Sequence, residues 1–449
     1  MTAHTLETDY ARSQVPLEQG RGWFKLAAVF VGICVGIPPM VLGADLAAGM
    51  GLSKAISVTL WSSLIAMPVC LLAAYVGTRS RLSTGMTLRF TFGVLGAQLI
   101  SAMIAVDMFC WSAMNMELFA DSVGNEARMI WQIHLAKWGL LVGAGLLMTI
   151  VTIFGYRSIE KVSFLMVPAL SGVVLSYFFH VFHKTEIHIA LARPAFGSPI
   201  DYFTALSVMV GSYLNLSVLL PDYTRYSKAA LDSAIAVILG LCLGLPIFVL
   251  LAAYLAAATG EPDFIRVMIA RGWGSPVIVT VAVACWFHMN SCLYSASLNL
   301  AAIIPRVPKW KLTVAAGLLA TVVTFVGIVA HYVSFLGIIS VLMPPITGVY
   351  TADYLRRRKS YNSGDSESVS RYRLSAIASL CIGALAGFMT TGRQNLGFGL
   401  FHLTHLPTID SFLVSFASQL LLNDYDKARP KSAALAVGEP GEVSGIVIG

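Results

Sequence analysis

The sequence predicts an all-α membrane protein, with about twelve transmembrane helices. Of its 449 residues, 57% are apolar and only 12% are charged, about half the charged share of a soluble domain. Apolar runs of about 20 residues, each long enough to cross a hydrocarbon core of about 30 Å, recur between Gly22 and Leu422. Two of these runs carry glycine beside proline or polar residues near their middle, which predicts helices interrupted at membrane depth.

Basic residues are concentrated in alternate loops. They precede the first span, follow the second and the fourth, and cluster again from Arg356 to Lys359. The positive-inside rule places these loops, and with them both termini, in the cytoplasm of an inner-membrane protein. Topology therefore explains the formal charge of +7 without a nucleic-acid partner. The first 19 residues contain no apolar core, so we expect no cleavable signal peptide.

The first span, about Phe24 to Gly49, contains Gly36, Pro38 and Pro39 at its middle. Pro38 restricts the preceding Ile37 to non-helical geometry, so we expect this helix to break there. An ordinary proline kink packed against neighbouring helices is the alternative.

The third span, about Val94 to Phe119, contains a charged residue on the same helix face as two other large polar or aromatic residues. Asp107, Trp111 and Asn115 are spaced by four residues and share one helix face. A carboxylate at the bilayer centre costs about 2.5–3.5 kcal/mol, so that face should look into the bundle or into water. Structural pairing with a lysine or arginine is the alternative for Asp107.

The sixth span contains Gly211, Ser212 and Asn215 at midplane depth, with Pro221 after them. We expect this helix to be interrupted as well, although a glycine that permits close helix packing is the alternative. Five spans separate it from the first interrupted helix, so the two would run in opposite directions. Paired broken helices of this kind indicate an inverted-repeat transporter with its site at the midplane.

The eighth span, about Pro276 to Ile303, has two polar stripes at helical spacing. One stripe consists of His288, Ser291, Ser295 and Asn299, and the other of Asn290, Tyr294 and Ser297. Polar groups between membrane helices gain only about 0.6 kcal/mol each, so their number favours a wet cavity over helix adhesion. A lone histidine at midspan is commonly a structural residue, and a proton carrier is the functional alternative.

The remaining sequence completes a division into two halves and two added helices. We expect a cytoplasmic tail at 1–23, five-helix repeats at 24–183 and 199–358, a cytoplasmic loop at 359–371, two further helices at 372–423 and a disordered tail at 424–449. The seven cysteines and the loop histidines show no metal-ligand spacing, and no catalytic motif with fixed spacing is present. We therefore expect no cofactor and no enzyme activity, and we assign no metal site, with metal binding by the loop histidines as the lesser alternative.

Several motifs in one order resemble the nucleobase:cation symporter family, and within it the bacterial cytosine permease branch. The resemblance covers nearly the whole chain. Its strongest parts are Arg89-Phe-Thr-Phe-Gly-Val-Leu-Gly96, Val210-Gly-Ser-Tyr213 with Asp222-Tyr-Thr-Arg-Tyr226, Leu293-Tyr-Ser-Ala296, and Pro344-Pro-Ile-Thr-Gly-Val349 with Ala352-Asp-Tyr-Leu355. It implies a leucine-transporter-type fold with two inverted five-helix repeats plus two extra helices.

The resemblance also implies roles for particular residues. Trp111 corresponds to a tryptophan that stacks on the base, and Tyr213 to an aromatic residue on the other side of the ring. The backbone around Gly211 and Ser212, together with Asn215, would approach the edge of the base. Recognition would be completed on the eighth helix by Asn290 and Ser291, and Asp107 would bond the base edge or carry the coupling proton.

Two departures from the family concern the eighth helix. Met289 precedes Asn290 where relatives have an asparagine before an acid or amide, so the substrate need not be cytosine. Sodium-coupled relatives supply adjacent hydroxyl groups and the backbone near Gly36 and Ile37, but this chain has Phe287 and His288 at the hydroxyl positions. The coupling ion is Na⁺ or H⁺, with H⁺ favoured.

We therefore expect a monomeric secondary transporter that imports a nucleobase or a related planar heterocycle, of cytosine or purine type, by cation-coupled symport and alternating access. Hydroxymethylpyrimidine-like vitamin precursors and hydantoin-type rings are the alternative substrates. A polytopic membrane enzyme and a receptor without transport are the competing classes. Chemically altered substrate in vesicles would indicate the enzyme, and absence of counterflow would indicate the receptor.

Overall fold

The computed structural model describes residues 10–184, 187–263, 274–325, 327, 332–363, 369–392 and 397–423. In these ranges the regular structure is helical, apart from one isolated bridge between Arg21 and Ser227. The helices are α1 (Trp23–Cys34), α2 (Ile37–Met50), α3 (Leu52–Ser80), α4 (Thr84–Trp131), α5 (Lys137–Ile153), α6 (Tyr156–Lys184), α7 (Ile187–Ala192), α8 (Tyr202–Thr224), α9 (Ala230–Ala236), the π-helical η3 (Val237–Leu243), α10 (Gly244–Thr259), α12 (Gly274–Ile303), α13 (Lys309–Thr324), α14 (Tyr332–Leu342), α15 (Pro344–Asn362), α16 (Leu374–Thr390) and α17 (Pro407–Leu422).

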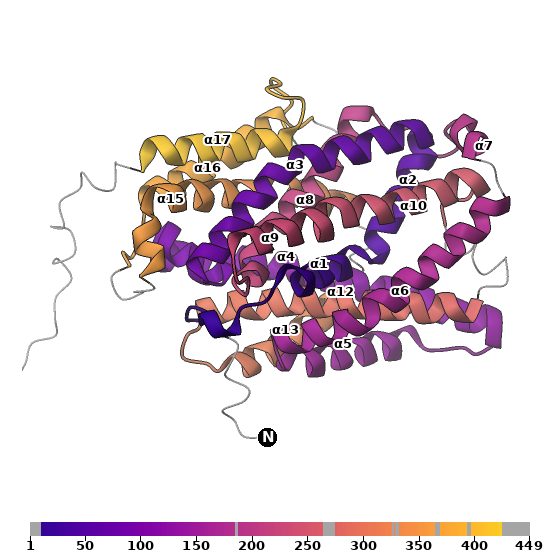
Figure 1. The fold of residues 1–449 in the computed structure, drawn as a ribbon, viewed down its shortest axis with the longest axis horizontal. Coiled ribbons are helices and arrows are strands. Elements are labelled where there is room, and N and C mark those ends of the chain that lie inside the picture. The colour runs from indigo at the N-terminus through magenta and orange to yellow at the C-terminus, as the bar shows by residue number, and fades with distance from the viewer. Residues whose placement is uncertain are drawn as a thin grey trace, which may run out of the picture.

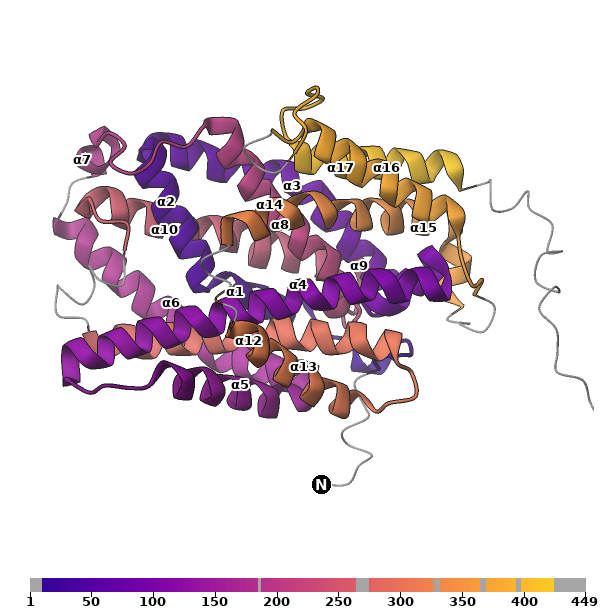
Figure 2. The ribbon, with the colours of Figure 1, turned by 180° about the vertical axis from the view of Figure 1, so that it is seen from behind.

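The long helices form one bundle of roughly aligned elements (Figure 1). α4 packs along α12, α3 along α8, and α2 along α10. Seen from behind, α4 and α12 cross almost the whole molecule side by side (Figure 2). α15, α16 and α17 pack together at one edge, and α5 and α13 lie at the opposite edge. The arrangement leaves the middle of α8 and of α12 inside the bundle.

Five of the described helices are long and apolar enough to cross a membrane, or six if α1 and α2 form one bent span. The shorter apolar helices α5, α16 and α17 also lie where spans are predicted. An all-α membrane fold is thus confirmed, while the expected total of about twelve crossings and the boundaries of the two repeats stay predictions.

The predicted break in the first span is confirmed. α1 and α2 meet at an angle of 57°. Gly36, at the start of α2, has an extended backbone with φ −104° and ψ 165°, and Pro38 and Pro39 occupy the first turn of α2. Proline lacks an N–H and fits the first helical turn, where no intrahelical partner is needed. The local sequence alone is enough to start a new helix here.

The predicted break in the sixth span is wrong. α8 is continuous from Tyr202 to Thr224, and the Ser212 hydroxyl donates to the Val208 carbonyl one turn earlier at 3.1 Å. A Cβ on Gly211 would lie 3.2 Å from Cβ of Ser340 in α14. Gly211 therefore permits close packing of two helices, which was the alternative interpretation.

Residues 222–226, at the end of α8, join the surrounding helices. Oδ1 of Asp222 accepts from the Thr84 N–H, the first residue of α4, at 2.8 Å. The hydroxyl of Tyr223 donates to the Ser291 carbonyl of α12 at 3.3 Å. The ring of Tyr226 stacks on a tyrosine of α6 with centroids 4.2 Å apart. One short segment thus fixes α8 to α4, α6 and α12.

Arg225 of this segment is fully buried. Its Nη1 donates to the Tyr10 carbonyl at 2.7 Å and its Nη2 to the Tyr294 hydroxyl at 2.9 Å. Tyr10 belongs to an N-terminal strap, residues 10–21. Arg12 of this strap donates to the carbonyl of Ala301, at the end of α12, and to that of Ile304, just beyond it. The guanidinium therefore ties the strap to α8 and α12 at one end of the bundle.

Candidate functional site

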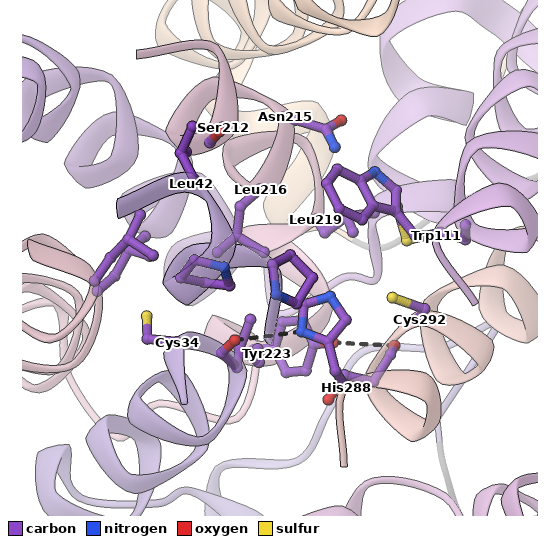
Figure 3. Close-up of a pocket in the computed structure, with 17 residues that line it drawn as sticks. Cys34, Leu42, Trp111, Ser212, Asn215, Leu216, Leu219, Tyr223, His288 and Cys292 are labelled. Atoms are coloured by element: carbon purple, nitrogen blue, oxygen red, sulfur yellow. Dashed lines mark hydrogen bonds between the residues drawn. The ribbon is translucent and has the colours of Figure 1, made fainter. Parts of the chain in front are cut away.

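A cavity of about 110 Å³ opens where the α1–α2 break faces α4, α8 and α12 (Figure 3). A water molecule needs about 10–15 Å³ by the same measure, so the cavity has room for a small organic molecule. Most of its lining is apolar, and the polar groups are few. The lining residues are Ile33, Cys34, Pro38, Pro39, Leu42, Met108, Trp111, Ser212, Asn215, Leu216, Leu219, Tyr223, Leu241, Leu245, His288, Ser291 and Cys292.

Trp111 brings the largest flat surface to the cavity. Asn215 holds its indole: with the amide oriented so that both of its ends have partners, Oδ1 accepts from Nε1 of Trp111 at 3.0 Å and Nδ2 donates to Oδ2 of Asp107 at 3.1 Å. The ring of Phe335 packs edge-on against the indole with centroids 5.7 Å apart. Figure 3 shows the Asn215 amide beside the indole. The plane of Trp111 is therefore fixed before any ligand arrives.

Asp107 lies behind this pair and does not line the cavity. It is only 4% exposed, and within the described ranges its Oδ1 has no hydrogen-bond partner. The alternative interpretation of Asp107, structural pairing with a lysine or arginine, finds no such partner among the described residues. Asp107 instead accepts a hydrogen bond from the amide of Asn215, which does line the cavity.

A side chain of α12, His288, contacts the main chain beside the α1–α2 break. Nδ1 of His288 lies 3.3 Å from the carbonyl oxygen of Ile33, in the last turn of α1. The same nitrogen would be 3.3 Å from a Cβ placed on Gly36, and the ring of Phe287 would be 2.7 Å from a Cβ placed on Gly32. These two glycines thus allow two aromatic side chains of α12 to approach the broken helix. Gly36 and Ile37 themselves are not part of the lining.

The structure brings together five of the predicted site residues, and these form one lining: Trp111, Ser212, Asn215, His288 and Ser291. It does not place Tyr213 there. The side chain of Tyr213 is fully buried beside Ser63 and Cys70 of α3. On a continuous helix, successive residues point about 100° apart, so Tyr213 cannot share the face of Ser212, and it supplies no second side for a ring sandwich.

Asn290 is also directed away from the cavity. Its Oδ1 accepts from the Thr152 hydroxyl of α5 at 2.9 Å, and its Nδ2 donates to the Trp286 carbonyl at 2.8 Å. Gly211 faces α14 rather than the lining. Three residues proposed by resemblance, Gly211, Tyr213 and Asn290, therefore have packing partners in this structure.

Most of the polar side chains on α12 form hydrogen bonds within the helix bundle and do not face a water-filled cavity. The Ser295 hydroxyl lies 3.4 Å from the Tyr223 hydroxyl, and Nδ2 of Asn299 donates to the Ser295 carbonyl at 2.9 Å. Among the side chains of this helix that the structure describes, His288, Ser291 and Cys292 reach the cavity. Helix adhesion, the alternative weighed for the stripe, accounts for the remainder.

Tyr223, Leu216 and Leu219 are lining residues that sequence reasoning missed. A signal was present: each of Ser212, Asn215, Leu216, Leu219 and Tyr223 lies three or four residues from another member of the set, which places them on one face of an unbroken helix. The expected break concealed this stripe. Among the described residues, no group of three or more His, Cys, Asp or Glu side chains could hold a metal ion.

Comparisons with known proteins give a consistent result. Residues 15–407 match a family described as permeases for cytosine/purines, uracil, thiamine and allantoin. The cytosine permease of Escherichia coli (strain K12) is 27% identical over 386 residues, which cover 86% of this chain and 90% of the relative.

Solved structures show the same fold. Mhp1, a nucleobase-cation-symport-1 family transporter in a closed conformation with bromovinylhydantoin bound, has a TM-score of 0.74 at 18% identity and covers 94% of both chains. A Na⁺-coupled sialic acid symporter has a TM-score of 0.63 at 14% identity, over 93% of this chain and 92% of its own.

Proposed function

Because the chain belongs to the nucleobase:cation symporter family, we propose that it imports a nucleobase or a related planar heterocycle across the inner membrane. Membership makes it a membrane transporter rather than an enzyme. Transport would proceed by cation-coupled symport and alternating access around the cavity. We expect a monomer to be sufficient, with both termini in the cytoplasm.

The observation that carries this proposal is the fixed indole of Trp111 in an otherwise apolar cavity. Stacking suits any aromatic heterocycle, because every base has a π-face. The hydroxyls of Ser212 and Ser291 and the imidazole of His288 are the polar groups available to the ring's edge. A flat molecule with one polar edge matches this lining better than a sugar or a charged amino acid does.

The choice among flat substrates is open to a direct test. We expect bases, hydroxymethylpyrimidine-like rings and hydantoins to differ in a thermal-shift screen of the purified protein, since a ligand that binds the native state raises its unfolding temperature. The best binder should then exchange in radiolabelled counterflow in proteoliposomes. Binding without counterflow would contradict transport, and chemical conversion of the label would indicate an enzyme.

Proton coupling is the form of symport that we propose. Carbonyl groups at the C-terminal end of a broken half-helix serve as cation ligands in transporters, and sodium needs oxygen partners there. In this chain the Ile33 carbonyl faces Nδ1 of His288, and Phe287 packs beside it. Neither side chain offers an oxygen. Asp107 is a second titratable group near the cavity.

We expect an inward proton gradient to drive accumulation in proteoliposomes that contain no sodium. A protonophore should abolish the accumulation but leave counterflow intact. A histidine can carry the coupling proton only if it titrates, so His288→Gln should uncouple uptake from the gradient. Robust sodium-driven uptake at constant pH would contradict proton coupling without affecting the assignment of the substrate.

Removal of the Asn215 amide tests whether the indole must be held in place. We expect Asn215→Ala to raise KM about 2- to 10-fold, because one hydrogen bond is worth about 0.5–1.5 kcal/mol, with little change in maximal rate. Asn115→Ala is the matched control, since Asn115 donates to the main-chain carbonyl of Trp111 and not to its ring. Equal effects of the two changes would show that Asn215 has no specific role.

A further inference from the structure

Two arginines from different helices converge on one tyrosine near the end of α3. Cζ of Arg79 lies 5.6 Å from the ring centroid of Tyr75, one helical turn earlier in α3. Cζ of Arg358, near the end of α15, lies 5.8 Å from the same centroid. Both arginine side chains are exposed. The charge pattern of the loops places this end of both helices at the cytoplasmic surface.

No carboxylate in the described part of the chain forms an ion pair with Arg79 or Arg358. The nearest acid along α15 is already occupied: Asp353 pairs with Arg373 at 2.7 Å and with Arg357 at 3.3 Å. The negative end of the α3 dipole favours a cation in its last turn, which accounts for Arg79 alone. It does not account for a second guanidinium, from another helix, at the same ring.

The same face of α3 is apolar, exposed around Leu60 to Pro68 and half-buried at Tyr75. Leu60 and Leu64 are 54% and 55% exposed, and Pro68 continues the row at the same four-residue spacing. Because residues spaced by three or four share a helix face, this row leads to Tyr75 and then to Arg79. Exposed apolar side chains at membrane depth contact lipid tails, and tyrosine is typical of the level of the headgroups.

We propose that Tyr75, Arg79 and Arg358 bind the phosphate of an anionic phospholipid of the cytoplasmic leaflet, with an acyl chain along the exposed row of α3. Basic pockets between helices on this side of a membrane attract anionic headgroups, and guanidinium pairs phosphate in a bidentate manner. The lipid phosphate would bridge α15 and α3, and α3 in turn packs along α8. The proposal does not depend on the transported substrate.

Thermal unfolding of the full chain in neutral detergent tests the site. Phosphatidylglycerol should raise the unfolding temperature by about 2 °C or more, whereas phosphatidylcholine should not. Arg79→Gln combined with Arg358→Gln should remove the phosphatidylglycerol shift. Arg356→Gln is the matched control, because Arg356 is exposed on the same helix and makes no ring contact with Tyr75 in the described structure, and it should retain the shift.

Two further arms keep the result decisive. Arg79→Lys with Arg358→Lys keeps both charges, so it should fold and show a reduced but measurable shift even if the glutamine pair does not fold. Inorganic phosphate at the same concentration should give no shift, because it lacks the acyl chain. A full phosphatidylglycerol shift in the glutamine pair, an equal shift with phosphatidylcholine, or an equal shift with inorganic phosphate would each overturn the lipid site.

Discussion

Trp111→Ala is expected to weaken saturable uptake severely while the protein still reaches the membrane. Stacking of a base on an aromatic side chain is worth about 1–3 kcal/mol, which corresponds to about a 5- to 150-fold loss of affinity. The substitution also removes the group that the Asn215 amide holds, so the amide would lose a partner inside a largely apolar cavity. Both effects weaken binding, and no other aromatic lining residue has an indole-sized face.

Uptake and equilibrium binding of the best ligand, measured with equal amounts of reconstituted protein, check this result. Trp111→Phe should retain part of the affinity, because a smaller aromatic face remains. Trp138→Ala, a change to an exposed tryptophan of α5 that is 67% accessible, should transport normally. Wild-type uptake by Trp111→Ala would refute the stacking role and leave the family membership untouched.

The fold was predictable because its signals are local. Long apolar runs demand backbone hydrogen bonds within each segment, and only helices or closed barrels provide them in lipid. The break before α2 was predictable for the same reason, since Pro38 and Pro39 remove N–H groups wherever the chain is placed. Gly211 gives no such constraint. Whether a glycine bends a helix or admits a neighbour depends on the neighbour, and here Ser340 of α14 occupies the space.

The site was predictable where residue spacing determined it. Trp111 and four polar candidates on α8 and α12 line the cavity, and their roles stay predictions. Tyr213 and Asn290 were transferred from relatives by position. The Tyr213 side chain is buried beside α3 and the Asn290 amide bonds to α5, neighbours that sequence spacing on one helix does not specify. The link from Asp107 through Asn215 to Trp111 joins α4 to α8 and likewise depends on tertiary packing.

Arg225→Ala is expected to lower the free energy of unfolding by about 3–5 kcal/mol, the range for removal of one partner from a buried charged network. Arg225 is fully buried and interacts electrostatically with Asp222, which is fully buried as well. Oδ2 of Asp222 has no hydrogen-bond partner among the described residues. Without the guanidinium, this carboxylate would remain in the interior with one N–H bond, from Thr84, and would lose the cation with which it interacts.

Denaturant or thermal unfolding in detergent measures the loss, and three variants separate its causes. Arg128→Ala, at an exposed position near the end of α4, should change stability by no more than about 0.5 kcal/mol. Arg225→Lys keeps the cation but cannot reach both Tyr10 and Tyr294, so we expect an intermediate loss. Asp222→Asn added to Arg225→Ala should restore part of the stability, because it removes the unpaired charge. If that double variant is no more stable than Arg225→Ala, the loss arises instead from the contacts to the strap and to Tyr294, and the strap rather than the charge pair holds the ends of α8 and α12 together.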